Sequence, residues 1–385
     1  MSTSLHDQYR HVKQQQPNIR IRDAAQVLSV SELELVALGC GDAAIRLQGP
    51  FAGLLKRLDG IGSLMGLTRN QHCVHEKTGP YEKISMHGAM GLALGEQIDL
   101  RLFLRHWVHG FAVTVHTPRG PRKSLQFFDA HGQAVHKIYV TDKTDDAAWN
   151  ALITDFTADD QSPVQAKPEP VTPKISTDHL VDADALRQDW STLKDTHDFF
   201  GMLRKHKVSR THAVALVEGD FTARTQVTVA EALLTRASEQ AVPIMAFVGN
   251  RGCIQIHSGP VKRILITGDW VNVMDPAFNL HLRQAAVAEA WVVRKPTVDG
   301  IVTSVELFDD AGEVVVRFFG VRKPGQPERA DWRALAGSFA TPRAEAADFS
   351  ETRGPLDATG ADPARYIAES GPSSGSAASS APKRP

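Results

Sequence analysis

The chain has 385 residues with 43 lysines and arginines against 44 aspartates and glutamates, which gives a formal net charge of −1. This length allows two domains. The neutral balance argues against a dedicated nucleic-acid-binding protein, and no run of about 18 apolar residues exists to form a transmembrane helix. The polar start lacks the apolar core of a signal peptide, and Cys40, Cys73 and Cys253 have no CxxC spacing, so we expect a cytoplasmic protein without disulfides, structural zinc or membrane insertion.

Composition divides the chain into two blocks, a linker and a tail. Residues 1–159 form an N-terminal repeat, and residues 176–345 form a C-terminal repeat. Between them, residues 160–175 hold four prolines and no aromatic residue, which predicts an extended linker. Residues 346–385 are rich in Gly, Ser, Ala and Pro, which predicts a disordered tail.

The two blocks are copies of one another. A shift of 180 residues aligns the region from about residue 63 to 140 without a gap. The matched pairs keep glycine, proline and turn residues: Met65/Met245, Asn70/Asn250, Cys73/Cys253, Gly79-Pro80/Gly259-Pro260, Gly88/Gly268, Gly120/Gly300, Asp129/Asp309 and Gly132/Gly312. The sequence therefore predicts a tandem duplication.

Each copy repeats one order of elements. A helical segment, 182–207 in the second copy, precedes short segments rich in Val, Ile, Phe and Thr that are typical of strands and hairpins. The clearest elements are the hairpins 124–140 and 302–320 and the tryptophan-bearing helices 147–156 and 332–339. This pattern predicts an α+β fold with mainly antiparallel sheets, present twice.

Positions that differ in chemistry between the copies are candidates for a site. The second copy gains cations and a helix histidine, while the first keeps an arginine of its own: Lys295 faces Val115, Arg322 faces Asp142, Arg317 faces Lys137, and Arg101 faces His281. Cations on strands beside a helix histidine suggest a pocket for an anionic ligand.

His197 is the candidate axial ligand. In a continuous helix, Trp190, Leu193, His197 and Phe200 would share one apolar face. Two interpretations remain open: a hydrogen-bonded core histidine, or an imidazole ligand to haem iron.

In the second interpretation, the neighbours of His197 would suit haem b (iron protoporphyrin IX). Phe199, Phe200 and Met202 would flank the macrocycle. Arg210, Lys295 and Arg322 would neutralise the propionates.

Other motifs give weaker signals. The chain has no GxGxxG, GxxxxGK[ST] or HExxH pattern. His72, Cys73 and His75 suggest a metal clip, but the second copy reads Gly252-Cys253-Ile254-Gln255, so strand histidines are favoured.

Several segments together resemble the HemS/ChuS/PhuS family of cytoplasmic haem-binding proteins, also called hemin-degrading factors, of bacterial haem-uptake systems. They are LMGLTRNQHCVHEKTGPYE, QIDLRLFLRHW, LQFFDAHGQAVHKIYVTDKTDDAAW, DTHDFFGMLRKHKVSR and AWVVRKPTVDGIVTSVELFDDAGE. The resemblance covers residues from about 20 to 340 and implies two similar halves, with large antiparallel sheets stacked centrally and helices outside.

The resemblance also implies roles. Haem would bind in the C-terminal half, with His197 on the iron and Arg101 reaching over the opposite face, where it would take part in any catalysis. Arg210, Lys295 and Arg322 fall on the family's propionate-side positions. Where the family often reads QLYGQR, this chain has Arg317-Phe318-Phe319-Gly320-Val321-Arg322, so Phe319 replaces a tyrosine and Arg317 a glutamine.

Three functions fit these residues. A carrier would take haem from an inner-membrane importer, hand it to a separate haem oxygenase and so serve the release of iron. A haem-degrading, oxygenase-like enzyme would open the porphyrin to a biliverdin-type product, with the chemistry belonging to the haem. A duplicated protein–protein scaffold would bind no haem at all.

Overall fold

The computed structural model describes residues 4–169, 181–323 and 325–341. Within them the two halves of the chain contain the same elements in the same order. The first half comprises α1 (Leu5–Gln15), α2 (Ile21–Leu28), α3 (Glu32–Ala37), β1 (Ala44–Leu47), α4 (Ala52–Lys56), β2 (Gly62–Arg69), β3 (Cys73–Pro80), β4 (Ile84–His87), β5 (Met90–Leu94), β6 (Asp99–Phe103), β7 (His109–Thr117), β8 (Gly120–Phe128), β9 (Ala134–Thr144) and α5 (Asp146–Phe156).

The second half repeats this series. It comprises α6 (Ala183–Ser191), α7 (Asp198–His206), α8 (Arg210–Leu216), β10 (Thr222–Arg224), α9 (Val229–Glu239), β11 (Ile244–Gly249), β12 (Cys253–Gly259), β13 (Ile264–Thr267), β14 (Trp270–Asp275), β15 (Phe278–Arg283), β16 (Glu289–Thr297), β17 (Gly300–Phe308), β18 (Val314–Gly320) and α10 (Ala330–Gly337). The predicted α+β duplication is confirmed.

The strands form two nine-stranded sheets, and each half lends three strands to the sheet of the other. The first sheet has the order β1-β7-β8-β9-β2-β3-β15-β14-β13, and the second has the order β10-β16-β17-β18-β11-β12-β6-β5-β4. Every ladder within these sheets is antiparallel among the described residues, with β15 paired to β3 and β6 paired to β12. The exchange places a strand of the N-terminal half, β6, inside the sheet of the C-terminal half.

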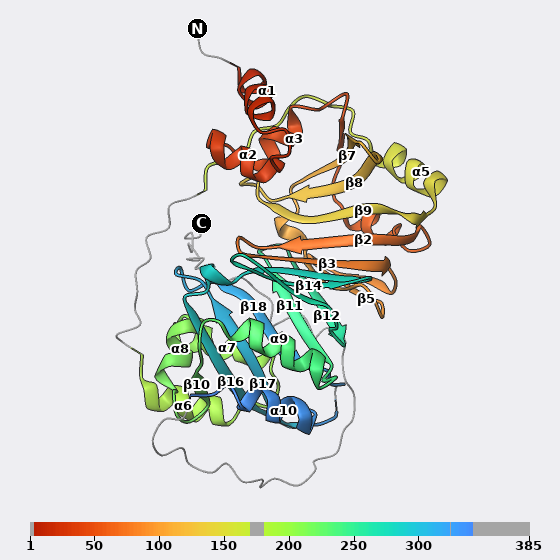
Figure 1. The fold of residues 1–385 in the computed structure, drawn as a ribbon. Helices are drawn as coiled ribbons and strands as arrows, with labels where there is room; N and C mark the ends of the chain where they lie inside the picture. The colour runs from red at the N-terminus through yellow and green to blue at the C-terminus, as the bar shows by residue number, and fades with distance from the viewer. Residues whose placement is uncertain (1–3, 170–180, 324, 342–385) are drawn as a thin grey trace, which may run out of the picture.

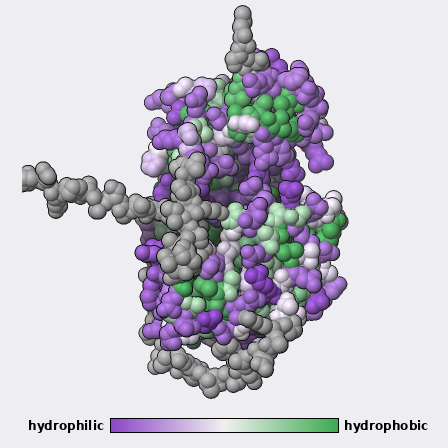
Figure 2. Space-filling model, turned by 90° about the vertical axis from the view of Figure 1, so that its left-hand side faces the viewer, coloured by the Kyte–Doolittle hydropathy of each residue, from purple (hydrophilic) through white to green (hydrophobic). Residues whose placement is uncertain are grey.

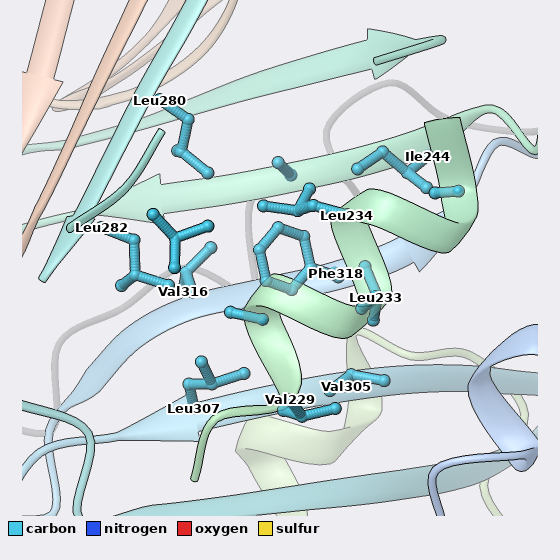
Figure 3. Close-up of a cluster of buried hydrophobic side chains, with 14 of the residues drawn as sticks. Val229, Leu233, Leu234, Ile244, Leu280, Leu282, Val305, Leu307, Val316 and Phe318 are labelled. Atoms are coloured by element: carbon cyan, nitrogen blue, oxygen red, sulfur yellow. The ribbon is translucent and has the colours of Figure 1, made fainter. Parts of the chain in front are cut away.

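The two sheets pack face to face at the centre, with helices outside them (Figure 1). Figure 3 shows the C-terminal core, in which Leu280 and Leu282 of β15 approach Val316 and Phe318 of β18 across the sheet boundary. α9 closes this core with Leu233 and its neighbours. Burial of these apolar side chains, each worth about 1.5–3 kcal/mol, therefore depends on contact between the two sheets.

Equivalent asparagines tie the halves together with matching bonds. The Asn70 side chain donates from Nδ2 to the Val315 carbonyl at 2.8 Å, and the Asn250 side chain donates to the Val135 carbonyl at the same distance. Each asparagine also accepts the backbone N–H of the following cysteine. These paired bonds explain why the asparagines appear in both copies of the sequence.

The predicted extended linker begins as irregular chain at residues 160–169, and its remainder lies outside the described residues. The predicted tail, residues 346–385, lies wholly outside them. None of the described helices is long and apolar enough to cross a lipid bilayer.

Candidate functional site

One face of the second sheet collects the polar residues that the sequence singled out. In an antiparallel sheet, directly paired residues and alternate residues along a strand share a face. The register pairs Glu306 with Arg317, and Ile254 with Arg101. We call this side the outer face; it carries Lys295, Glu306, Arg317, Phe319, Met245, Phe247, Ile254, Ile256, Asp99, Arg101, Met90 and Leu92.

The part of the outer face formed by β11, β12, β6 and β5 is an apolar floor. Its buried members are Leu92, Phe103, Ile254 and Ile256, with Met90, Leu94, Met245 and Phe247 packed around them. The ring of Phe247 meets that of Phe319 edge-on, with centroids 5.0 Å apart. Sequence reasoning missed this floor, because apolar residues at alternate positions of a strand do not show whether their face packs in the core or lines a separate surface.

Arg101 is the cation of this floor. Its side chain lies on β6 between Leu92 of β5 and Ile254 of β12, and it is only 5% exposed. Nη1 donates to the carboxylate of Asp99 on the same strand. Burial raises the pKa of Asp99, while the neighbouring Arg101 opposes that rise. The predicted distal arginine thus reaches the sheet of the C-terminal half through strand exchange.

Helices α6 to α8 cover the opposite end of the outer face, over β16 and β17 (Figure 1). Phe199 and Met202 lie in the buried core of this helical layer, and the Phe199 ring meets Trp190 edge-on at 4.7 Å. Trp190 donates from Nε1 to the Arg294 carbonyl of β16 at 2.9 Å. Of the three residues expected to flank a macrocycle, only Phe200 remains partly exposed.

The predicted continuous helix over 182–207 is wrong. α6 ends at Ser191, α7 begins at Asp198, and His197 is the N-cap residue of α7. The Asp195 carboxylate accepts the His197 backbone N–H at 2.9 Å, and Asp198 accepts the N–H of Asp195 at 3.1 Å. Such local aspartate bonds compete with helix continuation, so the supposed face with Trp190 and Leu193 does not exist.

The same aspartate holds the imidazole of His197. The Asp195 carboxylate contacts Nδ1, and the His197 side chain is 15% exposed. The bond to His197 lowers the pKa of Asp195 to about 2. Because a carboxylate only accepts, Nδ1 carries the proton, and Nε2 of the neutral ring is the atom with the metal-binding lone pair.

The loop that carries His197 rests on the turn between β16 and β17. The Lys194 carbonyl accepts the Val298 N–H at 2.9 Å. Arg322, which also lowers the pKa of Asp195, pairs with Asp299 of that turn at 3.4 Å. The structure therefore brings His197 and Arg322 to the same end of the outer face.

The other two predicted propionate partners share one buried carboxylate. Lys295 Nζ lies 3.1 Å from Glu306 Oε1, and Arg210 Nη1 lies 2.8 Å from Oε2. Burial alone would raise the pKa of Glu306, but these cations and Arg317 hold it below its usual value. Glu306 was missed because the first copy has Gln126 there, and a glutamate in a strand-like run gives no signal of its charge partners.

The His72–His75 segment does not form a metal site. His75 is a fully buried residue of β3, and no group of three or more His, Cys, Asp or Glu side chains within the described ranges is arranged to hold a metal ion. His75 is therefore a strand histidine, as predicted.

The surface is hollowed at mid-height on the side where α7 and α8 lie (Figure 2). Around this side the outer face presents an apolar floor, an imidazole with an oriented Nδ1–H, and arginines on both halves. Such a set suits a flat apolar ligand with a metal centre and an anionic edge.

Comparisons with known proteins found matches over most of the chain. The model of the haemin-degrading HemS.ChuX domain matches twice, at residues 29–156 and 207–339. The hemin transport protein HemS of Yersinia enterocolitica is 39% identical over 337 residues, which cover 86% of this chain and 96% of that protein.

Two solved structures are similar over nearly their whole length. The haem-bound form of PhuS, a heme-binding protein from Pseudomonas aeruginosa, is 47% identical with a TM-score of 0.85, covering 88% of this chain and 100% of that one. The heme-degrading enzyme ChuS of Escherichia coli O157:H7 is 36% identical with a TM-score of 0.81, covering 87% and 98%.

Proposed function

The chain belongs to the haemin-degrading HemS.ChuX domain family, and from that premise we propose that it is a haem-binding protein of a bacterial haem-uptake system. In this proposal it acts in the cytoplasm, receives haem from an inner-membrane importer and releases it to a haem oxygenase. The observation that carries the proposal concerns the outer face. Strand exchange places Arg101 of the N-terminal half in the second sheet, and His197 of the C-terminal half lies at the border of that sheet.

The residues present fit haem at three points. Nε2 of His197 is the iron donor, because Asp195 fixes the proton on Nδ1. Arg101, embedded in the apolar floor, provides the polar group on the other side of the ligand. The floor itself supplies the apolar surface that a macrocycle needs.

The anionic edge of haem is assigned chiefly to Arg322. Its side chain and that of its partner Asp299 are both 22% exposed, so a propionate can replace or share that contact at little cost. Lys295 is fully buried against Glu306, so its contribution is to the local positive potential beside the carboxylates of haem. Arg317 and Phe319 line the same face next to it.

The proposed binding mode suits transfer of haem to an acceptor, because it uses one imidazole and non-covalent side-chain contacts. A carrier must release its ligand, and a single neutral histidine allows exchange with an acceptor. The degrading alternative uses the same residues, with haem as substrate and Arg101 as the catalytic side chain near the porphyrin. Haem bound there would supply its own oxidative chemistry.

Hemin titration of the purified chain tests the proposal. The wild type should develop a Soret band with a stoichiometry of one, and His197→Ala should lower affinity and alter the spectrum. His206→Ala is the matched control, since this histidine lies on the same helix but bonds Asp189. If His197→Ala and His206→Ala bind hemin alike, with the wild-type spectrum, the axial assignment is wrong.

A second experiment separates carrier from enzyme. The hemin complex is mixed with a reductant under oxygen, with catalase present. A persistent Soret band supports the carrier, whereas loss of the band with catalase present supports the degrading enzyme. Loss only without catalase indicates attack by free peroxide.

A further inference from the structure

The last strand of the first sheet, β13, has exposed apolar side chains and an edge that pairs with no further strand among the described residues. It pairs with β14 on one side and ends the strand order on the other. Leu265 is 46% exposed and Ile266 is 43% exposed. Edge strands with exposed aliphatic side chains are sites where another strand adds.

The ladder shows which backbone groups point outward. The N–H of Met274 donates to the Arg263 carbonyl at 2.8 Å, so this pair faces inward. Because hydrogen-bonding pairs alternate along an antiparallel strand, Leu265 and Thr267 also turn their backbone groups to β14. The N–H and C=O groups of Ile264 and Ile266 therefore point to the open edge.

The charges around β13 are self-complementary. Lys262 and Arg263, both exposed, lie just before the strand, and Asp269, also exposed, lies in the turn just after it. Within the described ranges none of these three side chains is in an ion pair. A second copy running antiparallel brings the basic end to the acidic end twice, whereas a parallel copy would place like charges together.

We propose that β13 pairs with β13 of a second copy of this chain, antiparallel and centred on Ile266. In this register the two Ile266 residues exchange their outward N–H···O bonds. Arg263 then lies beside the turn that contains Asp269 of the partner subunit, and the two-fold axis repeats that contact. The result is a continuous sheet across two molecules.

The twin strand in the other repeat lacks these features. β4 ends the second sheet in the same way, but Ser85 and Met86, in place of Leu265 and Ile266, are half-buried. Lys83 precedes β4 as Arg263 precedes β13, but the residue that follows β4 at the position equivalent to Asp269 is Ala89. The complementarity therefore belongs to β13 and not to the duplicated architecture.

Four strand residues form a small contact, so the dimer is reversible, with a dissociation constant on the order of tens of micromolar. Sedimentation velocity of the full chain from about 2 to 200 µM tests this. Arg263→Glu and Asp269→Lys should each weaken association about tenfold or more. The double variant should return to within about threefold of the wild type, because the swapped charges attract again.

Two control measurements test whether the effect is specific to β13. Lys83→Glu beside β4 should leave the association unchanged. Hemin titration should be unaffected in the Arg263 and Asp269 variants, since β13 belongs to the first sheet and the outer face to the second. A wild type that stays monomeric up to 200 µM overturns the proposal. So does a double variant as weak as the single ones, or an equal loss with Lys83→Glu.

Discussion

Lys77 and His257 occupy equivalent positions in the two repeats, 180 residues apart, and their side chains meet at the centre of the molecule, with Nζ 3.2 Å from Nδ1. Because an ammonium only donates, Nδ1 of His257 accepts and Nε2 carries the proton. The ring stacks on Phe278 with centroids 3.7 Å apart and planes inclined by 2°. One duplicated position thus became a donor in one copy and an acceptor in the other.

This contact predicts acid sensitivity. Burial, with Lys77 beside it, lowers the pKa of His257 to about 3. Burial lowers the pKa of His136 to about 3 as well, and lowers that of His75. The unfolded chain protonates its histidines near pH 6.5, so it binds more protons than the native state below that pH. Stability is therefore present above about pH 6.5 and falls as pH drops toward 3.

Each such histidine contributes a slope of up to about 1.4 kcal/mol per pH unit within this window. Urea unfolding at about pH 7.5, 6.5, 5.5 and 4.5 measures it. His257→Gln keeps an acceptor for Lys77 but does not titrate, so it should remove the contribution of one histidine, up to about 1.4 kcal/mol per pH unit, from the slope. A slope in His257→Gln equal to that of the wild type would contradict the assignment.

The buried pair of Lys295 and Glu306 predicts a loss of stability that is distinct from ligand binding. Lys295→Ala leaves Glu306 buried with fewer cations and should cost about 2–4 kcal/mol of unfolding free energy. Lys295→Met combined with Glu306→Gln should recover part of this loss, because no buried carboxylate then lacks its lysine, whereas Arg210 and Arg317 lose the charge of Glu306. Chemical denaturation of the two variants beside the wild type checks the expectation, and an additive loss in the double variant would disprove it.

Arg322→Ala is the cleaner test of the propionate assignment, since its side chain is partly exposed and its partner Asp299 is at the surface turn. Hemin affinity should fall about five- to tenfold, as expected for one charge-assisted bond. The Soret position should stay unchanged, because the metal is not touched. Arg329→Ala, whose partner is the neighbouring Asp331, is the control and should bind hemin as the wild type does.

The sequence predicted the duplication because both copies must keep their turn glycines, as Gly132 and Gly312 show with φ of 78° and 76°. It did not predict strand exchange. β6 and β15 have similar apolar patterns, and pairing within a copy or across copies buries the same faces. Only the three-dimensional register decides between them.

The site was predicted in part for similar reasons. His197 and Arg101 stood out because the other repeat has different residues there. The carboxylates that hold them, Asp195 and Asp99, gave no signal, because a short-range side-chain bond depends on the local backbone path. The break before α7 was missed for the same cause, since apolar periodicity continues through it.

Asp195 is expected to tune the axial ligand. Asp195→Asn replaces a charged acceptor by a neutral one, which weakens the bond to Nδ1 and the donor strength of Nε2. Hemin affinity should fall about 10- to 100-fold, with a shifted Soret band and a more positive reduction potential of the bound hemin. Asp198→Asn, whose carboxylate accepts only a backbone N–H, should change the potential little.

Arg101 and Asp99 must be tested together. Arg101→Ala alone leaves a largely buried carboxylate without its arginine, so a loss of hemin binding could reflect unfolding of the floor. Arg101→Gln with Asp99→Asn removes both charges and preserves size and hydrogen bonding, so this variant should unfold at a urea midpoint close to that of the wild type. If Arg101 acts on the ligand, the double variant should keep the His197-dependent Soret band but lose any catalase-resistant decay under reductant and oxygen. A double variant that decays at the wild-type rate would show that Arg101 serves only the ion pair with Asp99.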